Sequence, residues 1–153
     1  MLVVSDTSPL TALLQIERAE LLPRIFQRIV VPPAVRAELL REHAVLPSWL
    51  ETRSPIAIPG TIALAQLDLG ETEALALALE IRADAVLIDE RLGRRVARTL
   101  GLRVTGLLGA LILAKQRGHL EAVKPVIEEL RTRAGCWFDD ALIADVINAA
   151  GEP

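Results

Sequence analysis

Short apolar runs alternate along this chain with segments of helical spacing, and this order is what most constrains the fold. The runs expected to form strands are LVVS at 2–5, RIVV at 28–31, AVLI at 85–88 and LRVT at 102–105, with PIAI at 55–58 as a candidate edge strand. Helix formers dominate the segments between them, as in ETEALALALEIR. The alternation predicts an α/β fold in which helices pack on both faces of a parallel sheet.

The length and apolar content of the chain limit the number of domains and the kind of surface that it can have. With 153 residues and no repeat or low-complexity segment, we expect a single domain over residues 1–153. Hydrophobic residues make up 52% of the chain, so part of the apolar surface is expected to lie at an interface. No apolar stretch approaches the length of a membrane span and no signal-peptide pattern opens the chain, so we expect a cytoplasmic location. The proline-containing segment 44–69 is expected to be an irregular connection.

Cysteine and histidine are too few for a thiolate or imidazole metal centre. The single cysteine, Cys136, excludes an internal disulfide, and His43 and His119 are the only histidines. Any metal is therefore expected to be bound by oxygen atoms. The net charge of -3 provides no overall basic field of the kind that grips nucleic acid tightly, which leaves weak or transient contact with a phosphate polymer.

Two aspartates occupy the same place relative to two apolar runs. Asp6 follows LVVS and Asp89 follows AVLI, and a helical segment comes after each. In open parallel sheets, ligands bind beyond the carboxyl ends of the strands, where the winding direction reverses. If these strands are neighbours, the two carboxylates meet there, and a hard cation such as Mg²⁺ would relieve their repulsion. Asp89 has an alternative role as the N-cap of the next helix, whereas near Asp6 that role is expected to fall to Ser8, ahead of Pro9.

Three glutamates are candidates to join the two aspartates. In PAVRAELLREH, Glu38 lies beside the expected buried stripe of a helix that begins at Pro33, and it either stays solvated or leans over the end of the first strand. In GETEALALALE, an almost wholly apolar helix, Glu71 and Glu73 stand in the first turn on opposite sides, so only one of them can readily face a metal. Acids in a first turn also suit the helix dipole.

The helix expected after Asp89 carries a basic face. Its members are Arg91, Arg94, Arg95 and Arg98. A basic helix face of this kind ordinarily faces solvent and has no binding role. Its position beside Asp89 also suits it to local contact with a polyanion backbone such as RNA.

Two early segments resemble motifs of the PIN-domain family, in particular a prokaryotic branch related to the VapC-type toxins of toxin–antitoxin systems. VVSDTSPL resembles the opening strand of the family with its first acid, which points to Asp6, with Ser8 as a helper. VVPPAVRAELL resembles the second motif, a strand followed by a helix that bears a glutamate, which points to Glu38. The resemblance extends along essentially the whole chain.

The later motifs of that family are matched in order by GETEALALALEIRADAVLID. The resemblance points to Glu71, in preference to Glu73, as the third acid and to Asp89 as the fourth. Toxins of the group commonly carry aspartate where Glu71 stands, and often a further aspartate where this chain has Arg91. The segment DDALIADVI at 139–147 also resembles the third motif superficially, but no strand with a terminal acid follows it, so its first two residues are expected to cap and begin a helix.

The resemblance implies a PIN-like three-layer α/β/α fold with a central, mostly parallel sheet, and the activity of an endoribonuclease dependent on Mg²⁺ or Mn²⁺. The implied catalytic and metal-binding residues are Asp6, Glu38, Glu71 and Asp89. Water would attack the phosphorus and leave a 5′ phosphate and a 3′ hydroxyl. The family further implies a toxin that forms a homodimer and pairs with a small antitoxin protein. The alternative is a PIN-like module that binds RNA or a protein with weak catalysis or none.

Other classes that gather acids at strand ends fit less well. A receiver-like phosphoacceptor needs a lysine after a late strand, but the only lysines, Lys115 and Lys124, fall in helical segments. A haloacid-dehalogenase-type phosphatase would carry a second aspartate where Ser8 stands. A dinucleotide-binding domain would carry a glycine-rich turn after the first strand, which is absent here.

Overall fold

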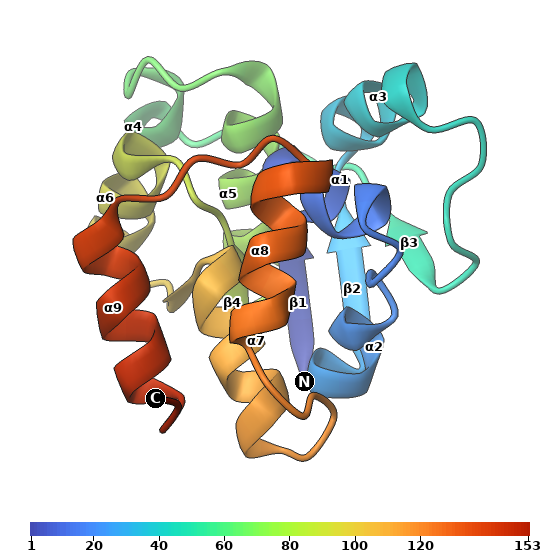
Figure 1. Cartoon of the computed structure of the whole chain (residues 1–153). Helices are drawn as coiled ribbons and strands as arrows, with labels where there is room; N and C mark the ends of the chain where they lie inside the picture. Colours follow the sequence, from blue (N-terminus) through green and yellow to red (C-terminus); the bar gives the residue numbers. More distant parts are fainter.

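One parallel sheet forms the centre of the structure, a computed structural model that describes residues 1–153 (Figure 1). Its strands lie in the order β3-β2-β1-β4-β5, and every neighbouring pair is parallel. The strands are β1 (Leu2–Ser5), β2 (Arg28–Val31), β3 (Leu50–Thr52), β4 (Ala85–Leu87) and β5 (Val104–Thr105). The central strand β1 therefore has the first half of the chain on one side and the second half on the other.

Helices cover both faces of the sheet and complete the three layers (Figure 1). One face packs against α1 (Thr7–Gln15), α2 (Leu21–Phe26), α7 (Leu107–Gln116), α8 (Lys124–Arg133) and α9 (Asp140–Ala149). The other face packs against α4 (Gly60–Ala63), α5 (Leu69–Glu80) and α6 (Arg91–Thr99). The remaining helix, α3 (Pro33–Glu42), contacts both α1 and α5 and so bridges the layers.

The central strands have sequences of consecutive apolar residues because both faces of the sheet are buried. In β1, Val3 belongs to the larger core cluster and Val4 to the smaller one, and both are fully buried. Val86 and Leu87 divide between the two clusters in the same way. This is the pattern expected of a parallel sheet covered by helices on each side.

The expected edge strand at 55–58 is wrong. The structure has its edge strand at Leu50–Thr52, where Leu50 is buried and pairs with Ile29 of β2. The segment 55–58 is not a strand: Ile56 is 90% exposed, and its amide donates to Glu80 Oε1 rather than to a sheet ladder. Pro55 at the start of this segment and Pro59 directly after it lack the backbone N–H that a strand donates.

The expected helix starts are confirmed at two places and wrong at one. α3 begins at Pro33, and Asp139 caps α9 by accepting from the Ala141 amide. Ser8 does not cap α1. The chain turns into the helix directly after β1, so Asp6 occupies the N-cap position, without a capping bond from its side chain, and Ser8 lies inside the first turn.

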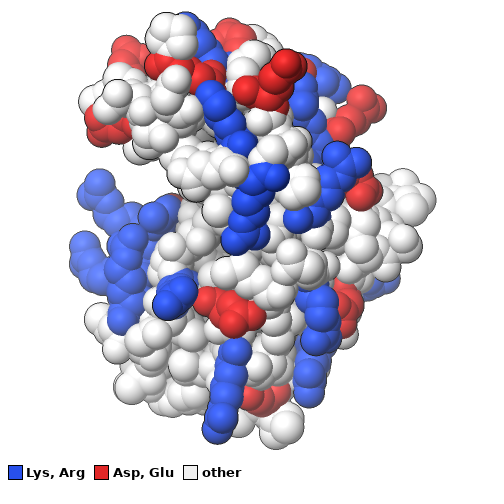
Figure 2. Space-filling model, turned by 90° about the horizontal axis from the view of Figure 1, so that it is seen from below, with Lys and Arg blue, Asp and Glu red and all other residues white.

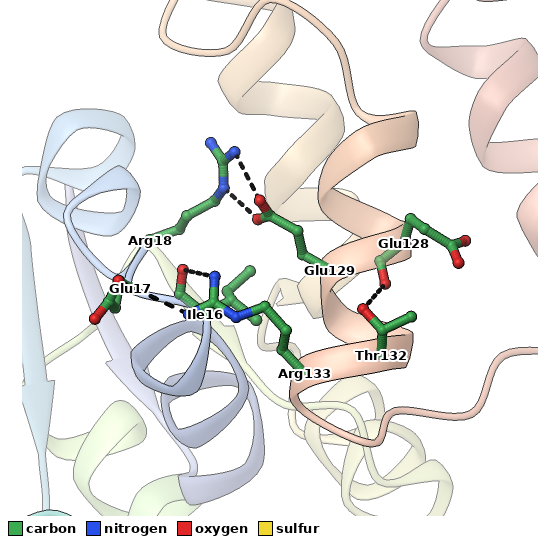
Figure 3. A network of polar contacts seen from close by, with 7 residues as sticks. All are labelled: Ile16, Glu17, Arg18, Glu128, Glu129, Thr132 and Arg133. Atoms are coloured by element: carbon green, nitrogen blue, oxygen red, sulfur yellow. Dashed lines mark hydrogen bonds and ion pairs between the residues drawn. The ribbon is translucent and has the colours of Figure 1, made fainter.

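Polar contacts tie α8 to the end of α1 (Figure 3). Arg18 Nε donates to Glu129 Oε2 over 2.7 Å, and Arg133 lies 3.8 Å from Glu17. Figure 3 also shows that the Glu128 side chain points away from this network. The charged contacts therefore hold one side of α8 against the end of α1, and the Glu128 side chain takes no part in them.

Glu152 joins the ends of two helices. Its carboxylate accepts from Lys115 Nζ at the end of α7 and from the Val123 and Lys124 amides at the start of α8. The Lys115 ammonium and the two amides lower the pKa of Glu152 to about 2. None of the nine helices combines the length and the apolar character that a membrane crossing requires.

Candidate functional site

The winding of the sheet reverses between β1 and β4, and the expected meeting of their carboxyl ends is confirmed. The chain builds β2 and β3 on one side of β1 and then crosses to β4 on the other. The Asp6 amide donates to the Leu87 carbonyl over 2.9 Å, so Asp6 leaves β1 directly beside the end of β4. Asp89 follows two residues after Leu87. Both aspartates therefore emerge at the edge where open parallel sheets bind ligands.

Asp6 and Glu71 are the only charged residues among the 46 that are buried. Asp6 is 6% exposed and Glu71 is 5% exposed. Neither takes part in a salt bridge. Burial of two unpaired acids is costly, which makes Asp6 and Glu71 candidates for a functional site.

Three carboxylates from separate elements converge on Gly70, in the first turn of α5. A Cβ atom at this position would lie 3.0 Å from Glu38 Oε1, 3.4 Å from Asp6 Oδ1 and 3.5 Å from Asp68 Oδ1. The absence of a side chain at Gly70 leaves the space that these oxygens surround. The carboxylates thus share one small volume at the end of β1.

Glu71 extends the cluster between α5 and α6. Its Oε2 atom is buried without any hydrogen-bond partner, and it would lie 2.6 Å from a Cβ atom at Gly93 of α6. Burial, together with the nearby carboxyls of Asp68 and Asp6, holds the pKa of Glu71 well above its usual range. An orphaned carboxylate oxygen in a buried acidic cluster is the kind of atom that a bound cation would satisfy.

The pKa of Asp6 is also raised, to about 6. Burial is the largest cause, and the neighbouring charges of Asp68, Glu38 and Asp89 add to it, while the Thr7 amide opposes it. The electrostatic field at Asp6 thus comes from acids in three other parts of the chain. The raised pKa of Asp6 is therefore the electrostatic consequence of burial and of the convergence around Gly70.

The two glutamates of the first turn of α5 point to different partners. Glu73 Oε1 accepts from the Ala34 amide in the first turn of α3, over 3.1 Å, and so serves that helix. Glu38 of α3 is half-buried and is fixed by Thr7, whose Oγ1 donates to Glu38 Oε2 over 2.6 Å. The structure brings Glu38 and Glu71 to the acidic cluster and gives Glu73 a capping role.

Asp89 forms the exposed end of the cluster. Its Oδ1 atom accepts from the Leu107 amide over 3.0 Å, so it serves the start of α7. The N-cap position of α6 belongs to Glu90, which makes no capping bond. Arg94 lies close to Asp89, because a Cβ atom at Gly106 would be 2.6 Å from Arg94 Nη1 and 2.7 Å from Asp89 Oδ1. The alternative of a cap on the following helix is therefore wrong for Asp89.

Sequence reasoning missed Asp68 and Thr7. Asp68 is exposed, and its Oδ1 accepts from the Glu71 amide over 2.8 Å as the N-cap of α5. The spacing of Asp68 and Glu71, an N-cap acid three residues before a glutamate, is a capping-box signature that could have revealed it. Nothing in the sequence signals that Thr7 would reach a glutamate 31 positions away.

The basic face expected on α6 is present. Arg91, Arg95 and Arg98 are exposed and Arg94 is half-buried, and none of the four forms a salt bridge. Figure 2 shows basic side chains gathered along one wall of a hollow at the edge of the molecule. Ser8 is exposed and its hydroxyl forms no hydrogen bond, so it is free to meet a ligand.

The donor set fits a hard cation by its chemistry. All of the converging ligands are carboxylate oxygens, which Mg²⁺ and Mn²⁺ prefer, and the most buried of them lack counterions. The side chains as they lie do not form a finished cage, because no group of three or more His, Cys, Asp or Glu residues is placed to hold a metal ion.

Comparison with known proteins identifies a family. A family model described as a PIN domain matches residues 2–152, almost the whole chain. No curated protein and no solved structure matches the chain.

Proposed function

The chain belongs to the PIN-domain family, a nuclease-type fold, and from this premise we propose that it is a metal-dependent endoribonuclease. The observation that carries the proposal is the convergence of Asp6, Glu38 and Asp68 around Gly70, with the unpartnered Glu71 carboxylate beside them. Uncompensated acids at the switch point of a parallel sheet suit a reaction in which a phosphate and a cation meet.

The residues that would hold Mg²⁺ or Mn²⁺ are Asp6, Glu38, Glu71 and Asp89. When bound, the cation would supply Lewis-acid activation of water and neutralise charge on the phosphate. Rotation of the carboxylates is required for this, since they do not stand in a finished cage. Thr7 holds Glu38 through its Oε2 atom and leaves Oε1 directed at the cluster, and the Leu107 amide holds the Oδ1 atom of Asp89.

The remaining polar residues would position the substrate. Arg91, Arg94, Arg95 and Arg98 offer charge to a phosphate backbone beside Asp89, and the exposed Ser8 hydroxyl faces the same region. No side chain is needed as a nucleophile, because water attacks the phosphorus. The products would carry a 5′ phosphate and a 3′ hydroxyl.

We propose further that the enzyme acts as a toxin, as a homodimer that a small antitoxin protein inhibits. The resemblance of its motifs to those of VapC-type toxins and the apolar content of the chain support this role. Induced expression in a bacterial host should arrest growth, and the Asp6→Asn substitution should relieve the arrest. Growth arrest that persists with Asp6→Asn would contradict the toxin role.

A second candidate is a PIN-like module that binds RNA or a protein without turnover. Two observations favour it: the acids lack a finished metal cage, and Arg91 stands where toxins of the group often carry a further aspartate. Fewer acids weaken the hold on a second cation, and with it the rate of hydrolysis.

One set of assays separates the two candidates. RNA is incubated with the protein in Mn²⁺ or in EDTA, next to Asp6→Asn and to Glu128→Gln, a matched loss of charge at an exposed side chain outside the cluster. The nuclease proposal expects Mn²⁺-dependent cleavage that falls about a hundredfold or more in Asp6→Asn alone. Mn²⁺ binding, followed by electron paramagnetic resonance, should weaken in the same variant. Mn²⁺ binding without cleavage would favour the binding module, and unchanged cleavage in Asp6→Asn would exclude the proposed site.

A further inference from the structure

An open cleft of about 770 Å³ adjoins the acidic cluster. We call it the α7–α9 cleft, because α7, α9 and the loop between α8 and α9 supply most of its lining. Asp89 and Ser8 line it as well, so the cleft reaches the Asp89 end of the acidic cluster. A molecule that occupies the cleft is therefore next to the proposed site of reaction.

The lining of the α7–α9 cleft is mainly apolar and includes an exposed aromatic side chain. Trp137 is 85% exposed, and it lies in the irregular segment 135–139 that joins α8 to α9. Phe138 and Leu142 line the same cleft, and Leu142 is 45% exposed. A large indole held in water beside further apolar side chains marks a surface that binds something flat and apolar.

The positive charge around the cleft indicates what kind of molecule binds there. Arg94 lines the cleft, and the exposed Arg91, Arg95 and Arg98 continue the basic face on the same helix without ion pairs. A nucleotide matches both features, since its base is apolar on its faces and its phosphate is anionic. A purely apolar partner would leave the arginines unused.

We propose that the α7–α9 cleft binds an unpaired nucleobase of RNA, with Trp137 as the stacking residue and the arginines of α6 as contacts for the adjoining phosphates. The inference rests on the proposed function, in which Asp89 belongs to the site that acts on the RNA. The bound base would lie next to that site. A base inside a duplex has both faces covered by its neighbours, so only a single-stranded or unstacked nucleotide can present a face to Trp137.

Fluorescence of Trp137 tests the proposal directly. The chain has two tryptophans, and Trp49 is a remote one whose Nε1 donates to Glu20 Oε1, so Trp49→Phe leaves Trp137 as the single reporter. The protein is titrated in EDTA, which prevents cleavage, with a short oligoadenylate and with an abasic ribose-phosphate oligomer of the same length. The adenylate should quench Trp137 saturably, and the abasic oligomer should bind more weakly and leave the emission unchanged.

Substitutions at the same position give a second readout. Trp137→Ala should weaken adenylate binding about tenfold, and Trp137→Phe should retain part of the affinity, because stacking on an aromatic ring contributes about 1–3 kcal/mol per base. Binding of the abasic oligomer should be the same in all three proteins. Equal affinity of the two oligomers, or an unchanged affinity in Trp137→Ala, would overturn the proposal.

The outcomes separate this inference from the proposed nuclease. Quenching by adenylate without any cleavage in Mn²⁺ would support the stacking site and contradict the nuclease. Cleavage in Mn²⁺ with no effect of adenylate on Trp137 would do the reverse. If Trp137→Ala leaves RNA binding intact but dissociates an oligomer in sedimentation analysis, the cleft is a protein interface and the stacking proposal is wrong.

Discussion

Thr7 Oγ1 donates a hydrogen bond of 2.6 Å to Glu38 Oε2, which fixes an acid of α3 to the first turn of α1. Thr7→Val keeps the shape of the side chain and removes this bond. We expect the affinity for Mn²⁺ to fall about tenfold or more, as is typical when a residue that orients a metal ligand is lost. Electron paramagnetic resonance measures this affinity. Thr7→Ser keeps the hydroxyl and should bind Mn²⁺ as the wild type does; equal loss in both variants would contradict the role of the bond.

Asp68 contributes negative charge as well as a helix cap, and two substitutions separate these roles. Asp68→Asn keeps an oxygen for the Glu71 amide and removes the charge, so Mn²⁺ should bind severalfold more weakly while the metal-free protein at neutral pH becomes no less stable. Asp68→Ala also removes the cap and should cost about 1 kcal/mol in the free energy of unfolding. Mn²⁺ titration and urea unfolding provide the two measurements. Wild-type Mn²⁺ affinity in both variants would exclude Asp68 from the cation's surroundings.

The metal-free protein should lose stability as the pH rises from acidic to neutral. Asp6 has its pKa raised from 3.8 to about 6, and that of Glu71 is raised further above its usual range. The folded state therefore holds protons that the unfolded chain has released, and the free energy of unfolding falls through this window. Urea unfolding at about pH 5 and about pH 7.5 measures the slope. Asp6→Asn should flatten it, and a stability that rises across this range would contradict the arrangement of the acids.

Gly93 should accept a side chain only at a cost in stability. A Cβ atom there would lie 2.5 Å from Ile88 Cδ1 and 2.6 Å from Glu71 Oε2, so Gly93→Ala should destabilise the protein by about 1–3 kcal/mol through overpacking. The matched control is Gly60→Ala, because a Cβ atom at Gly60 meets nothing within 4 Å. Thermal unfolding compares the two. Equal melting temperatures of the two variants would contradict the close packing of Gly93 against Ile88 and Glu71.

Glu152 should stabilise the junction of α7 and α8. Glu152→Gln removes the charge that Lys115 and the Val123 and Lys124 amides bind, which should cost about 1–2 kcal/mol. The pKa of Glu152 is lowered from 4.5 to about 2, so its contribution is complete above about pH 4.5 and is lost as the pH falls toward 2. Unfolding in urea at neutral pH measures the loss, and Glu121→Gln, at an exposed residue, serves as the control. Equal unfolding of the two variants would contradict the clamp.

The alternation of apolar runs was enough to predict the parallel sheet, since β1 and β2 have the expected bounds and both faces of the sheet are covered. The edge strand was misplaced because strand 50–52 has only one buried residue, and its pairing with β2 is a tertiary contact without a local pattern. Propensity and spacing describe neighbours in sequence, whereas an edge strand is defined by what lies beside it.

The site residues could be predicted where an acid directly follows a strand. They could not be predicted where an acid caps a helix. Asp6 and Asp89 follow apolar runs, and parallel strands bring such ends together. Asp68 lies in the proline-containing connection, where no periodicity marks it, and its approach to Glu38 depends on how α3 packs against α5. The misplaced cap at Ser8 has a similar cause, because the turn after β1 is too tight to leave room for a separate capping residue.

Gly93 packs closely against Glu71, so the two sides of α6 have different surroundings. The buried side abuts the acids, while Arg95 and Arg98 face solvent on the other, about 10 Å away across the width of a helix. A nucleic-acid strand bound along Arg95 and Arg98, as proposed, would lie about one helix width from the buried Glu71 side of α6. To reach the acids, such a strand would have to bend at the start of α6, beside Asp89 and Arg91, and this bend would favour a flexible single strand over a stiff duplex.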